Sequence, residues 1–265
     1  MLVVIRGAGD IASGIAIRLH RSGMRVVMTD TARPTAIRRT VSFSGAVVSG
    51  SQTVEDVTAR LARGTEEVCD ILDAGDIAVM VDEGANCIAL LRPEAVVDAI
   101  LAKRNLGTTM DIAPVVVGVG PGFTAGVDCH AVVETMRGHT LGRVYYRGSA
   151  LPNTAVPGLI GGFAGERVLR APADGTFRQL REIGALVEAG ETVGTVEGKP
   201  MVCTISGVLR GILADGTPVT KGMKSGDVDP RGNVENCYTV SDKALAVGGG
   251  ALEAVLRLTG AVRGK

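Results

Sequence analysis

The chain has 265 residues, 28 of them basic and 28 acidic, so its formal net charge is zero. Because the Lys and Arg residues are scattered, the sequence offers no basic footprint for nucleic acid or for an anionic membrane surface. Aromatic residues make up only 3% of the chain and Trp is absent, which argues against a base-stacking surface. No apolar stretch is long enough to cross a bilayer, and the first residues resemble a strand, not a signal peptide. We therefore expect a cytoplasmic α/β protein with neither nucleic acid nor membrane among its partners.

The first thirty residues follow a pattern of strand, glycine turn, helix, second strand and acidic residue. The apolar run at residues 2–5 has the length and β-branching of a buried strand, and the glycine turn at residues 7–10 follows at once. A helical pattern comes next, and then a second strand at residues 25–29, which ends at Asp30. Asp30 lies 21 residues after Gly9, the spacing of a dinucleotide-binding βαβ unit. The pattern predicts a Rossmann-like nucleotide-binding domain.

Each residue of this pattern has a physical role in such a site. Gly7 permits the tight turn, and Gly9 allows a diphosphate to approach the backbone. Ala12 lets the helix lie close to the strand, and the helix N-terminus at Asp10 offers unpaired N–H groups to the anion. Asp30 would accept hydrogen bonds from ribose hydroxyls. These five residues are predicted to bind a cofactor, and the alternative is that the loop is only structural.

Three arginines after the second strand are the candidate phosphate ligands: Arg33, Arg38 and Arg39. We expect a helix through residues 34–39, and guanidinium groups near a glycine-lined cleft are natural bidentate donors to phosphate. The alternative is that these arginines lie on a solvated helix face.

A second glycine loop follows a later strand. We expect a buried strand at residues 77–81, a helix at residues 94–103 that begins after Pro93, and a strand at residues 115–117. The last strand leads into the candidate cofactor-binding residues Gly118, Gly120 and Gly122. Because ligands of open α/β sheets bind beyond the carboxyl ends of parallel strands, the two glycine loops would line one cleft. The alternative is that these glycines only turn the chain.

The segment after the second glycine loop holds the weak catalytic candidates Cys129, His130 and Glu134. As a helix, this segment would place His130 and Glu134 on one face, as acid/base or metal partners require. As a strand it would separate them by about 13 Å, and the adjacent valines favour the strand. The five cysteines have long, irregular gaps and form no CxxC pair, so the sequence predicts neither a disulfide framework nor a metal site.

The second half of the chain contains an internal repeat. Residues 173–196 and 205–228 match each other with a shift of 32 and no gap. The recurring glycines and valines resemble the half-motif of biotinyl and lipoyl domains. Lys199 lies on the hairpin between the halves, but it stands too close to the second half and is followed by Pro, so neither biotin nor lipoate is expected. A helix at residues 243–258 comes last, and its three central glycines require close packing by another backbone.

The predicted fold class is therefore α/β with two domains. Residues 1–142 form the Rossmann-like domain. Residues 143–265 form a β-rich barrel-sandwich hybrid of the biotinyl/lipoyl type, followed by the C-terminal helix.

Six phrases spread over nearly the whole chain carry a family resemblance: Arg6–Asp10, Arg38–Ser44, Leu101–Asn105, Gly118–Gly126, Glu134–His139 and Gly226–Arg231. Together they resemble the YqeB family. This resemblance implies an association with selenium-dependent molybdenum hydroxylase systems, in molybdenum cofactor biosynthesis or maturation. It also suggests a looser parallel with the XdhC chaperones, which pair a Rossmann domain with handling of the molybdenum cofactor.

Two functions follow from these observations. The favoured one is an accessory protein for selenium-dependent molybdenum hydroxylases, which binds a nucleotide or a molybdopterin-type dinucleotide cofactor in the glycine-lined cleft. Its partners would be the hydroxylase apoenzyme or other maturation factors. The alternative is an NAD(P)-dependent oxidoreductase, which Asp30 and the dinucleotide-binding pattern favour. Such an enzyme needs a proton donor, and His130 and Cys129 are the only candidates for it. The sequence leaves open whether the chain is catalytic and whether it forms a homo-oligomer.

Overall fold

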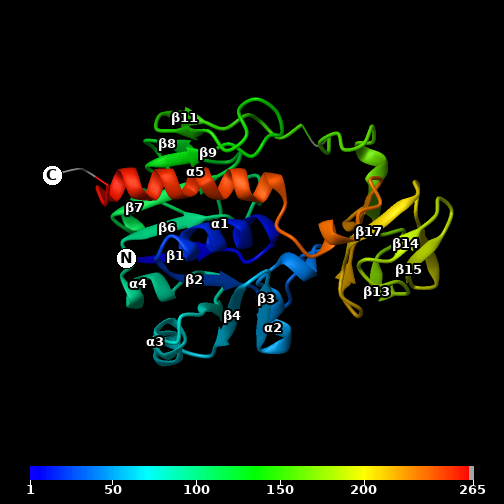
Figure 1. The fold of residues 1–265 in the computed structure, drawn as a ribbon, viewed down its shortest axis with the longest axis horizontal. Helices are drawn as coiled ribbons and strands as arrows, with labels where there is room; N and C mark the ends of the chain where they lie inside the picture. Colours follow the sequence, from blue (N-terminus) through cyan, green and yellow to red (C-terminus); the bar gives the residue numbers. More distant parts are fainter. Residues whose placement is uncertain (155, 263–265) are drawn as a thin grey trace. The chain divides into compact units, whose positions relative to one another are not determined.

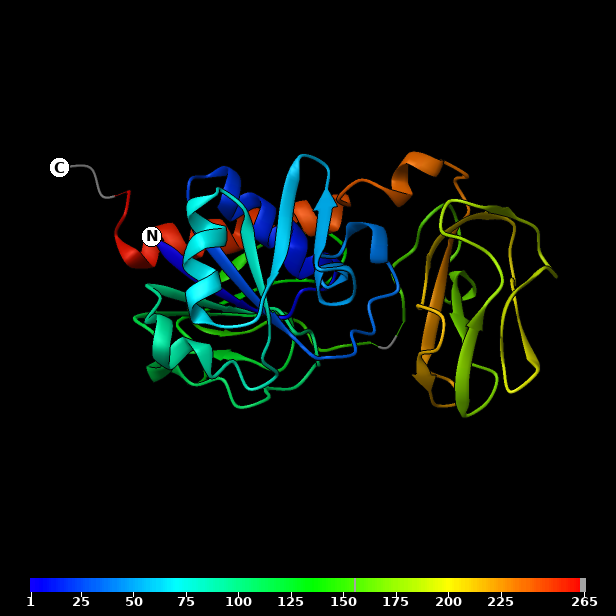
Figure 2. The same ribbon diagram turned by 90° about the horizontal axis from the view of Figure 1, so that it is seen from below.

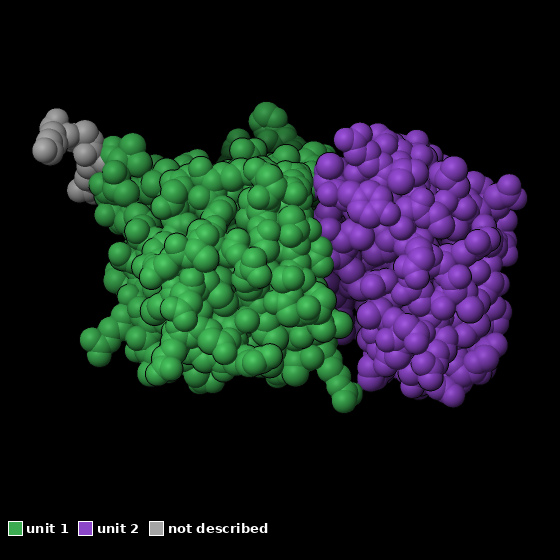
Figure 3. All heavy atoms as spheres, turned by 60° about the horizontal axis from the view of Figure 1, so that its bottom comes forward, with its two compact units in different colours: residues 1–34, 42–154, 240–265 green, residues 35–41, 155–239 purple. Residues whose placement is uncertain are grey.

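The computed structural model describes residues 1–154 and 156–262. The chain divides into two compact units, which Figure 3 shows in different colours. Unit 1 comprises residues 1–34, 42–154 and 240–265, and unit 2 comprises residues 35–41 and 155–239. Each unit is thus assembled from separate stretches of sequence, whereas a single boundary after residue 142 was expected.

Unit 1 is built on one large sheet and a small one. The strands of the large sheet are β1 (Leu2–Arg6), β2 (Arg25–Asp30), β3 (Ser51–Val54), β4 (Val57–Ala62), β5 (Ile77–Val81), β6 (Ala95–Asp98), β7 (Val115–Val119), β9 (Ala131–Val133) and β10 (Val144–Tyr145). Their order is β10-β9-β7-β6-β1-β2-β5-β4-β3. All pairings from β9 to β4 are parallel, and the edge strands β10 and β3 are antiparallel to their neighbours. The small sheet pairs β8 (Thr124–Ala125) with β11 (Gly148–Ser149).

Helices cover both faces of the large sheet. They are α1 (Asp10–Arg21), α2 (Gly45–Ser49), α3 (Thr65–Asp73), α4 (Cys87–Leu91) and α5 (Asp242–Thr259), with short 3-10 turns at η1 (Arg39–Val41) and η2 (Met110–Ile112). Helices α1 and α5 lie side by side over one face (Figure 1). On the opposite face, Val4, Val27 and Val96 pack with Val68 and Leu72 of α3. The central strands are buried on both sides, which explains their nearly continuous Val, Ile and Ala composition.

Glycines allow α5 to approach its neighbours closely. A Cβ atom on Gly248 would lie 2.8 Å from the carbonyl oxygen of Gly14 in α1, and one on Gly250 would overlap the carbonyl oxygen of Gly142. The C-terminal helix is thus confirmed, and so is backbone packing at Gly248 and Gly250, whereas the space beside Gly249 is open among the described residues. The helix belongs to unit 1.

Two predicted helices are wrong. Residues 94–103 form strand β6 and a loop, because the β-branched pair Val96 and Val97 lies in a segment that pairs with β1 on one side and β7 on the other. The segment at residues 34–39 is not helical before η1, because its backbone bonds outside the segment: the carbonyl oxygen of Ile37 accepts from the N–H of Ile212 at 2.8 Å.

Unit 2 is made of short antiparallel strands. They are β12 (Val168–Arg170), β13 (Gly175–Gln179), β14 (Leu186–Val187), β15 (Thr192–Val196), β16 (Lys199–Val202), β17 (Gly207–Ile212), β18 (Pro218–Val219) and β19 (Lys224–Asp229), with 3-10 turns at η3 (Gly165–Arg167) and η4 (Val234–Cys237). They form two four-stranded sheets of order β12-β19-β17-β14 and β16-β15-β13-β18 (Figure 2). An apolar core containing Phe177, Val193 and Leu209 draws residues from both sheets. Strands β13, β14 and β15 each begin 32 residues before β17, β18 and β19, as the repeat predicted.

The predicted fold class, a Rossmann-like domain followed by a biotinyl/lipoyl-like domain and a helix, is wrong. The large sheet is mixed and nine-stranded, and antiparallel strands close both of its edges. The connections from β6 to β7 and from β7 to β9 contain no α-helix, so the regular alternation of strand and helix breaks down in this half of the sheet. Unit 2 consists of two antiparallel sheets with strands β12 and β16 outside the repeat, and it includes residues 35–41. No helix within the described residues has the length and apolarity needed to cross a membrane.

Candidate functional site

The candidate site lies where the parallel strands of unit 1 end. Strands β2, β1, β6, β7 and β9 run in one direction, so their carboxyl ends meet at one edge of the sheet. The turn at residues 7–10 follows β1, and the loop at residues 120–122 follows β7. Asp30 ends β2 at the same edge. The structure therefore brings the two glycine loops and Asp30 to one side of unit 1, where open α/β sheets bind ligands.

Gly7 is required by close packing. Its φ is +97°, and its N–H donates to the carbonyl oxygen of Thr29 at 2.8 Å. A Cβ atom at this position would lie 2.9 Å from the carbonyl oxygen of Ala99 and 3.2 Å from Cα of Ile100. The space beside Gly7 is thus filled by the loop that follows β6.

Gly9 differs from Gly7 because the space beside it is open. It is half-buried at the N-cap of α1 with a φ of −68°, and a Cβ atom there would meet no heavy atom of the described residues within 4 Å. The next residue, Asp10, accepts a hydrogen bond from the N–H of Ile11 at 2.9 Å through its own carboxylate. One N–H group of the first helical turn is therefore already satisfied, which weakens the expected anion site on the helix axis. Ala12 is buried in the same helix.

Asp30 lies directly beside this turn. Its carboxylate accepts a hydrogen bond from the N–H of Thr31 at 2.7 Å. Burial raises the pKa of Asp30 above its ordinary value, Glu83 adds to the rise, and the N–H groups of Thr31 and Ala8 oppose it. A partly buried carboxylate with spare acceptor capacity is suited to a hydroxyl donor that replaces the lost water.

The second glycine loop is filled by the protein itself. A Cβ atom on Gly118 would overlap the ring of Phe123. Gly120 has a φ of +81°, with Oγ1 of Thr135 2.8 Å from the Cβ position, and Gly122 has a φ of +111°, with Cα of Arg104 2.7 Å away. These contacts explain structurally why glycine is needed at all three positions. The predicted role of these glycines in cofactor binding stays a prediction.

The structure separates the catalytic candidates. Segment 131–133 is strand β9, so His130 lies before its amino end and Glu134 follows its carboxyl end. Nδ1 of His130 accepts from the N–H of Val116 at 3.0 Å. The fully buried carboxylate of Glu134 accepts backbone N–H groups from Thr135, Met136 and Leu151 at 2.7, 2.7 and 2.8 Å. Glu134 thus anchors two chain segments, and His130 is held against Val116 of β7.

Cys129 has no surroundings that would activate it. Its side chain is fully buried, and desolvation raises the pKa of the thiol to about 11. A nucleophilic cysteine needs the opposite shift, because the thiolate is the reactive form.

The candidate phosphate ligands divide between the units. Arg33 is exposed in unit 1, shortly after β2. Arg38 and Arg39 belong to unit 2, where Arg38 donates to the carbonyl oxygen of Asn236 at 2.9 Å and Arg39 donates to that of Ile212 at 2.9 Å. Both guanidinium groups therefore hold together the backbone of unit 2.

Sequence reasoning missed a buried ionic network at the candidate edge. Nη1 of Arg6 and Oδ2 of Asp98 are 3.0 Å apart, and Oγ1 of Thr108 donates to the same oxygen at 2.6 Å. Oδ1 of Asp98 accepts from the N–H of Ile100 at 3.2 Å. This network fixes the loop after β6. Its sequence signal was Asp98 directly after a pair of valines, an acidic residue at the end of a strand like Asp30.

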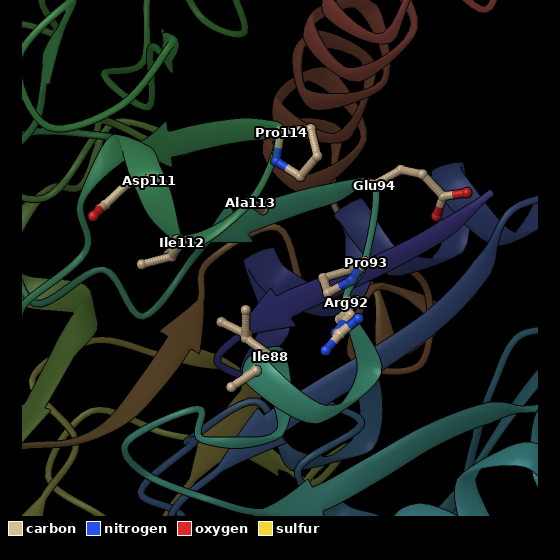
Figure 4. Close-up of a pocket in the computed structure, with 9 residues that line it drawn as sticks. Ile88, Arg92, Pro93, Glu94, Asp111, Ile112, Ala113 and Pro114 are labelled. Atoms are coloured by element: carbon tan, nitrogen blue, oxygen red, sulfur yellow. The ribbon is translucent and has the colours of Figure 1, made fainter.

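A groove of about 530 Å³ lies at the opposite end of these strands (Figure 4). Helix α4 with Ile88 and Arg92 forms one side, and Ile112 and Pro114 lie on the other. The groove precedes the amino ends of β6 and β7, whereas Asp30 and the two glycine loops follow the carboxyl ends of their strands. Within residues 1–154 and 156–262, no group of three His, Cys, Asp or Glu side chains is placed to hold a metal ion.

No family model matches the chain. A search of curated proteins finds "Uncharacterized protein YqeB" of Escherichia coli strain K12, which is 52% identical over 257 residues. The match covers 97% of this chain and 48% of that protein. This match supports the resemblance of the chain to the YqeB family. The chain thus spans about half the length of the curated relative it matches, and the relative's name states no activity.

Similar solved structures are named as aspartoacylases and succinylglutamate desuccinylases. An aspartoacylase family protein from Mesorhizobium loti matches with 12% identity and a TM-score of 0.26, over 86% of this chain and 83% of that one. A succinylglutamate desuccinylase/aspartoacylase from Rhodobacter sphaeroides matches with 15% identity and a TM-score of 0.24, over 84% and 86% of the two chains. With scores this low, no activity passes from these proteins to this chain.

The two predicted functions, molybdenum hydroxylase maturation and NAD(P)-dependent oxidoreduction, are corrected here, because the comparisons lend them no support. The printed names of the similar structures are aspartoacylase and succinylglutamate desuccinylase, and the name of the curated relative states no activity. The geometry of the chain also speaks against the oxidoreductase, because Cys129 is fully buried and Nδ1 of His130 already accepts the N–H of Val116. The arginines expected to hold an anionic pterin serve unit 2 instead.

Proposed function

We propose that unit 1 binds a nucleotide at the carboxyl edge of its parallel strands. The ribose hydroxyls donate to Asp30, and the phosphate end passes over Gly9. The observation that carries this proposal is the open space at Gly9, because the other glycines of both loops are packed against protein atoms.

The chemistry of the turn supports a ligand with hydroxyl donors. The carboxylate of Asp30 is partly desolvated, and two N–H donors do not exhaust the capacity of its two oxygens. A ribose diol supplies two O–H donors at the spacing of a carboxylate, and charge-assisted hydrogen bonds of this kind are stronger than neutral ones. Binding also returns to Asp30 part of the hydration that folding removed.

Asp10 limits where the phosphate can lie. Its carboxylate caps the N–H of Ile11, so a phosphate on the axis of α1 would meet negative charge. The phosphate therefore lies to the side of the helix axis, towards the loop after β6 that packs on Gly7.

Isothermal titration calorimetry with ADP, GDP, CDP and UDP tests the proposal. At least one of these nucleotides should bind, and its 2′,3′-dideoxy form should bind about tenfold more weakly, since an unfilled buried acceptor costs roughly 1–3 kcal/mol. Asp30→Asn should reduce binding of the ribose form more than that of the dideoxy form. Failure of all four nucleotides to bind would overturn the proposal.

The matched control is Asp82→Asn. Asp82 follows β5 beside Asp30, but its carboxylate is held by the N–H of Cys87 at 2.8 Å and by Nδ2 of Asn86 at 3.0 Å. Its burial works towards a higher pKa, and these hydrogen bonds outweigh it and lower the pKa. The substitution should leave nucleotide affinity unchanged. An equal loss in both variants would mean that only the negative charge of this edge matters, and not a contact at Asp30.

A further inference from the structure

One loop joins the two glycine loops. This bridging loop, residues 99–108, follows β6 and contacts Gly7 through Ala99, Gly120 through the side chain of Leu101, and Gly122 through the backbone of Arg104. Its course along the candidate edge explains why Gly7, Gly120 and Gly122 have no side chains. Between these contact points, Ala102 and Lys103 are exposed.

The bridging loop contains backbone strain. Leu101 and Lys103 have φ values of +61° and +63°, which cost non-glycine residues roughly 1–2 kcal/mol each. The strain is held by buried anchors at both ends of the loop. The N–H of Ala99 donates to the carbonyl oxygen of Arg6 at 2.9 Å, and the N–H of Thr108 donates to Oδ1 of Asn105 at 2.7 Å.

A buried donor lies at the base of this loop. Arg6 is 6% exposed, and its Nε atom has no hydrogen-bond acceptor among the described residues. Its Nη1 atom is engaged with Asp98, and its Nη2 atom donates to the carbonyl oxygen of Leu106 at 3.3 Å. A buried N–H group without a partner favours the arrival of an acceptor, either water or a ligand oxygen.

The edge carries acidic residues beside α1 and β2 and two adjacent cations on the bridging loop, with Arg33 exposed after β2 as a further cation. Asp10 and Asp30 lie on the side of α1 and β2, and the cations Lys103 and Arg104 lie exposed on the bridging loop. A ligand with a hydroxyl-bearing end and an anionic end has one favourable orientation over such an edge.

We infer that the bridging loop is the phosphate-binding element of the site, with Lys103 and Arg104 as the cations that meet the ligand's phosphate. This inference rests on the proposed function. It moves the phosphate contacts from Arg38 and Arg39 of unit 2, and from the N-terminus of α1, to a loop whose strained backbone holds two adjacent cations at the edge.

The inference is tested by calorimetric titration of the double variant Lys103→Ala, Arg104→Ala with ADP and with adenosine. If another nucleoside diphosphate binds the wild type more tightly than ADP, that nucleotide and its nucleoside are used instead. ADP affinity should fall at least tenfold, and adenosine affinity should stay within a factor of two. The wild-type ADP affinity should also decline with added KCl, and this salt dependence should be smaller in the double variant, because screened charge pairs carry it. Lys103→Arg should retain most of the ADP affinity.

Lys199→Ala is the control for loss of an exposed cation elsewhere, since Lys199 lies on β16 of unit 2. It should change neither affinity. A double variant that binds ADP as tightly as wild type overturns the inference and leaves the proposed function standing. An equal loss of ADP and adenosine overturns it as well, because the loop would then act through the fold. A wild-type chain that binds no nucleotide overturns the proposed function first.

Discussion

The two glycine loops lie at the same edge of unit 1, yet their glycines are used differently. In the loop after β1, the space beside Gly9 is open, whereas Gly7 is packed against Ala99. In the loop after β7, the space beside each glycine is taken by Phe123, Thr135 or Arg104. A glycine pattern marks where a side chain is missing. Only the neighbouring atoms show whether the space serves a ligand or the fold.

The buried ion pair beneath both loops should produce the largest effect. Asp98→Ala removes the carboxylate that Arg6 and Thr108 contact and leaves the buried guanidinium uncompensated. We expect the free energy of unfolding to fall by about 3–5 kcal/mol, measured by urea denaturation. The double variant Arg6→Met, Asp98→Leu should lose less than the single one. A larger loss in the double variant would show that the charges themselves, and not the unpaired guanidinium, decide stability.

Gly122→Ala tests whether the second loop is closed to a side chain. Its φ of +111° and the backbone of Arg104 at 2.7 Å both oppose a Cβ atom. The expected loss is roughly 2–4 kcal/mol of unfolding free energy, because overpacking adds to the left-handed strain. Gly126→Ala is the matched control: its φ is +87° but its Cβ position is open among the described residues, so only about 1 kcal/mol should be lost. Equal losses would mean that conformation alone, and not contact, requires Gly122.

Two substitutions in the first loop should separate fold from binding. Gly7→Ala should reduce the free energy of unfolding by about 2 kcal/mol, since Ala99 blocks the new side chain. Gly9→Ser should change it by less than about 0.5 kcal/mol, because Gly9 has ordinary backbone angles and serine is a preferred N-cap residue. Gly9→Ser should nevertheless weaken nucleotide binding at least tenfold in calorimetry. Unchanged affinity in Gly9→Ser would show that no ligand approaches this glycine.

The pH dependence of nucleotide binding should report the pKa of Asp30. The ionised carboxylate accepts the ribose hydroxyls, so affinity should fall as the pH decreases through its raised pKa, by at most about tenfold per pH unit. The decline should begin above the ordinary range for an aspartate. The raised pKa of Asp30 makes the free energy of unfolding change with pH in the opposite direction to the binding affinity. The folded state binds the proton more tightly than the unfolded one, so the contribution of Asp30 to folding falls as the pH rises from the unfolded to the folded pKa. Asp30→Asn should flatten the binding profile.

Local sequence patterns located the elements with strong periodicity. Strands β1 and β2, helix α1 between them and helix α5 agree with the predicted segments. The two strands are short, continuous apolar runs buried on both faces, and the two helices follow a period of 3.6. Strand β6 was missed, since a proline followed by alanines, valines and charged residues also fits a helix beginning. Its burial on both faces comes from the neighbouring strands, which local sequence does not show.

Only those residues of the candidate site that lie close together in the sequence could be predicted. Asp30 and Gly9 stand within one βαβ unit, so their spacing revealed them. The Arg6–Asp98 pair joins residues 92 positions apart, and the contact of Arg104 with Gly122 depends on a loop that was expected to be the end of a helix. Such contacts follow from the order of strands in the sheet, which no short motif encodes. The roles of Arg38 and Arg39 were missed for the same reason, because they bond to carbonyl groups more than 100 residues away.

Backbone amide chemical shifts during a nucleotide titration test the central claim most directly. The account predicts that the amides of Gly9, Ile11 and Thr31 shift first and furthest, together with that of Lys103. The amides of unit 2 and of the groove beside Ile88 should stay in place. Saturable shifts confined to that groove or to unit 2, with Gly9 and Thr31 unmoved, would contradict the claim that the open space at Gly9 is a ligand site.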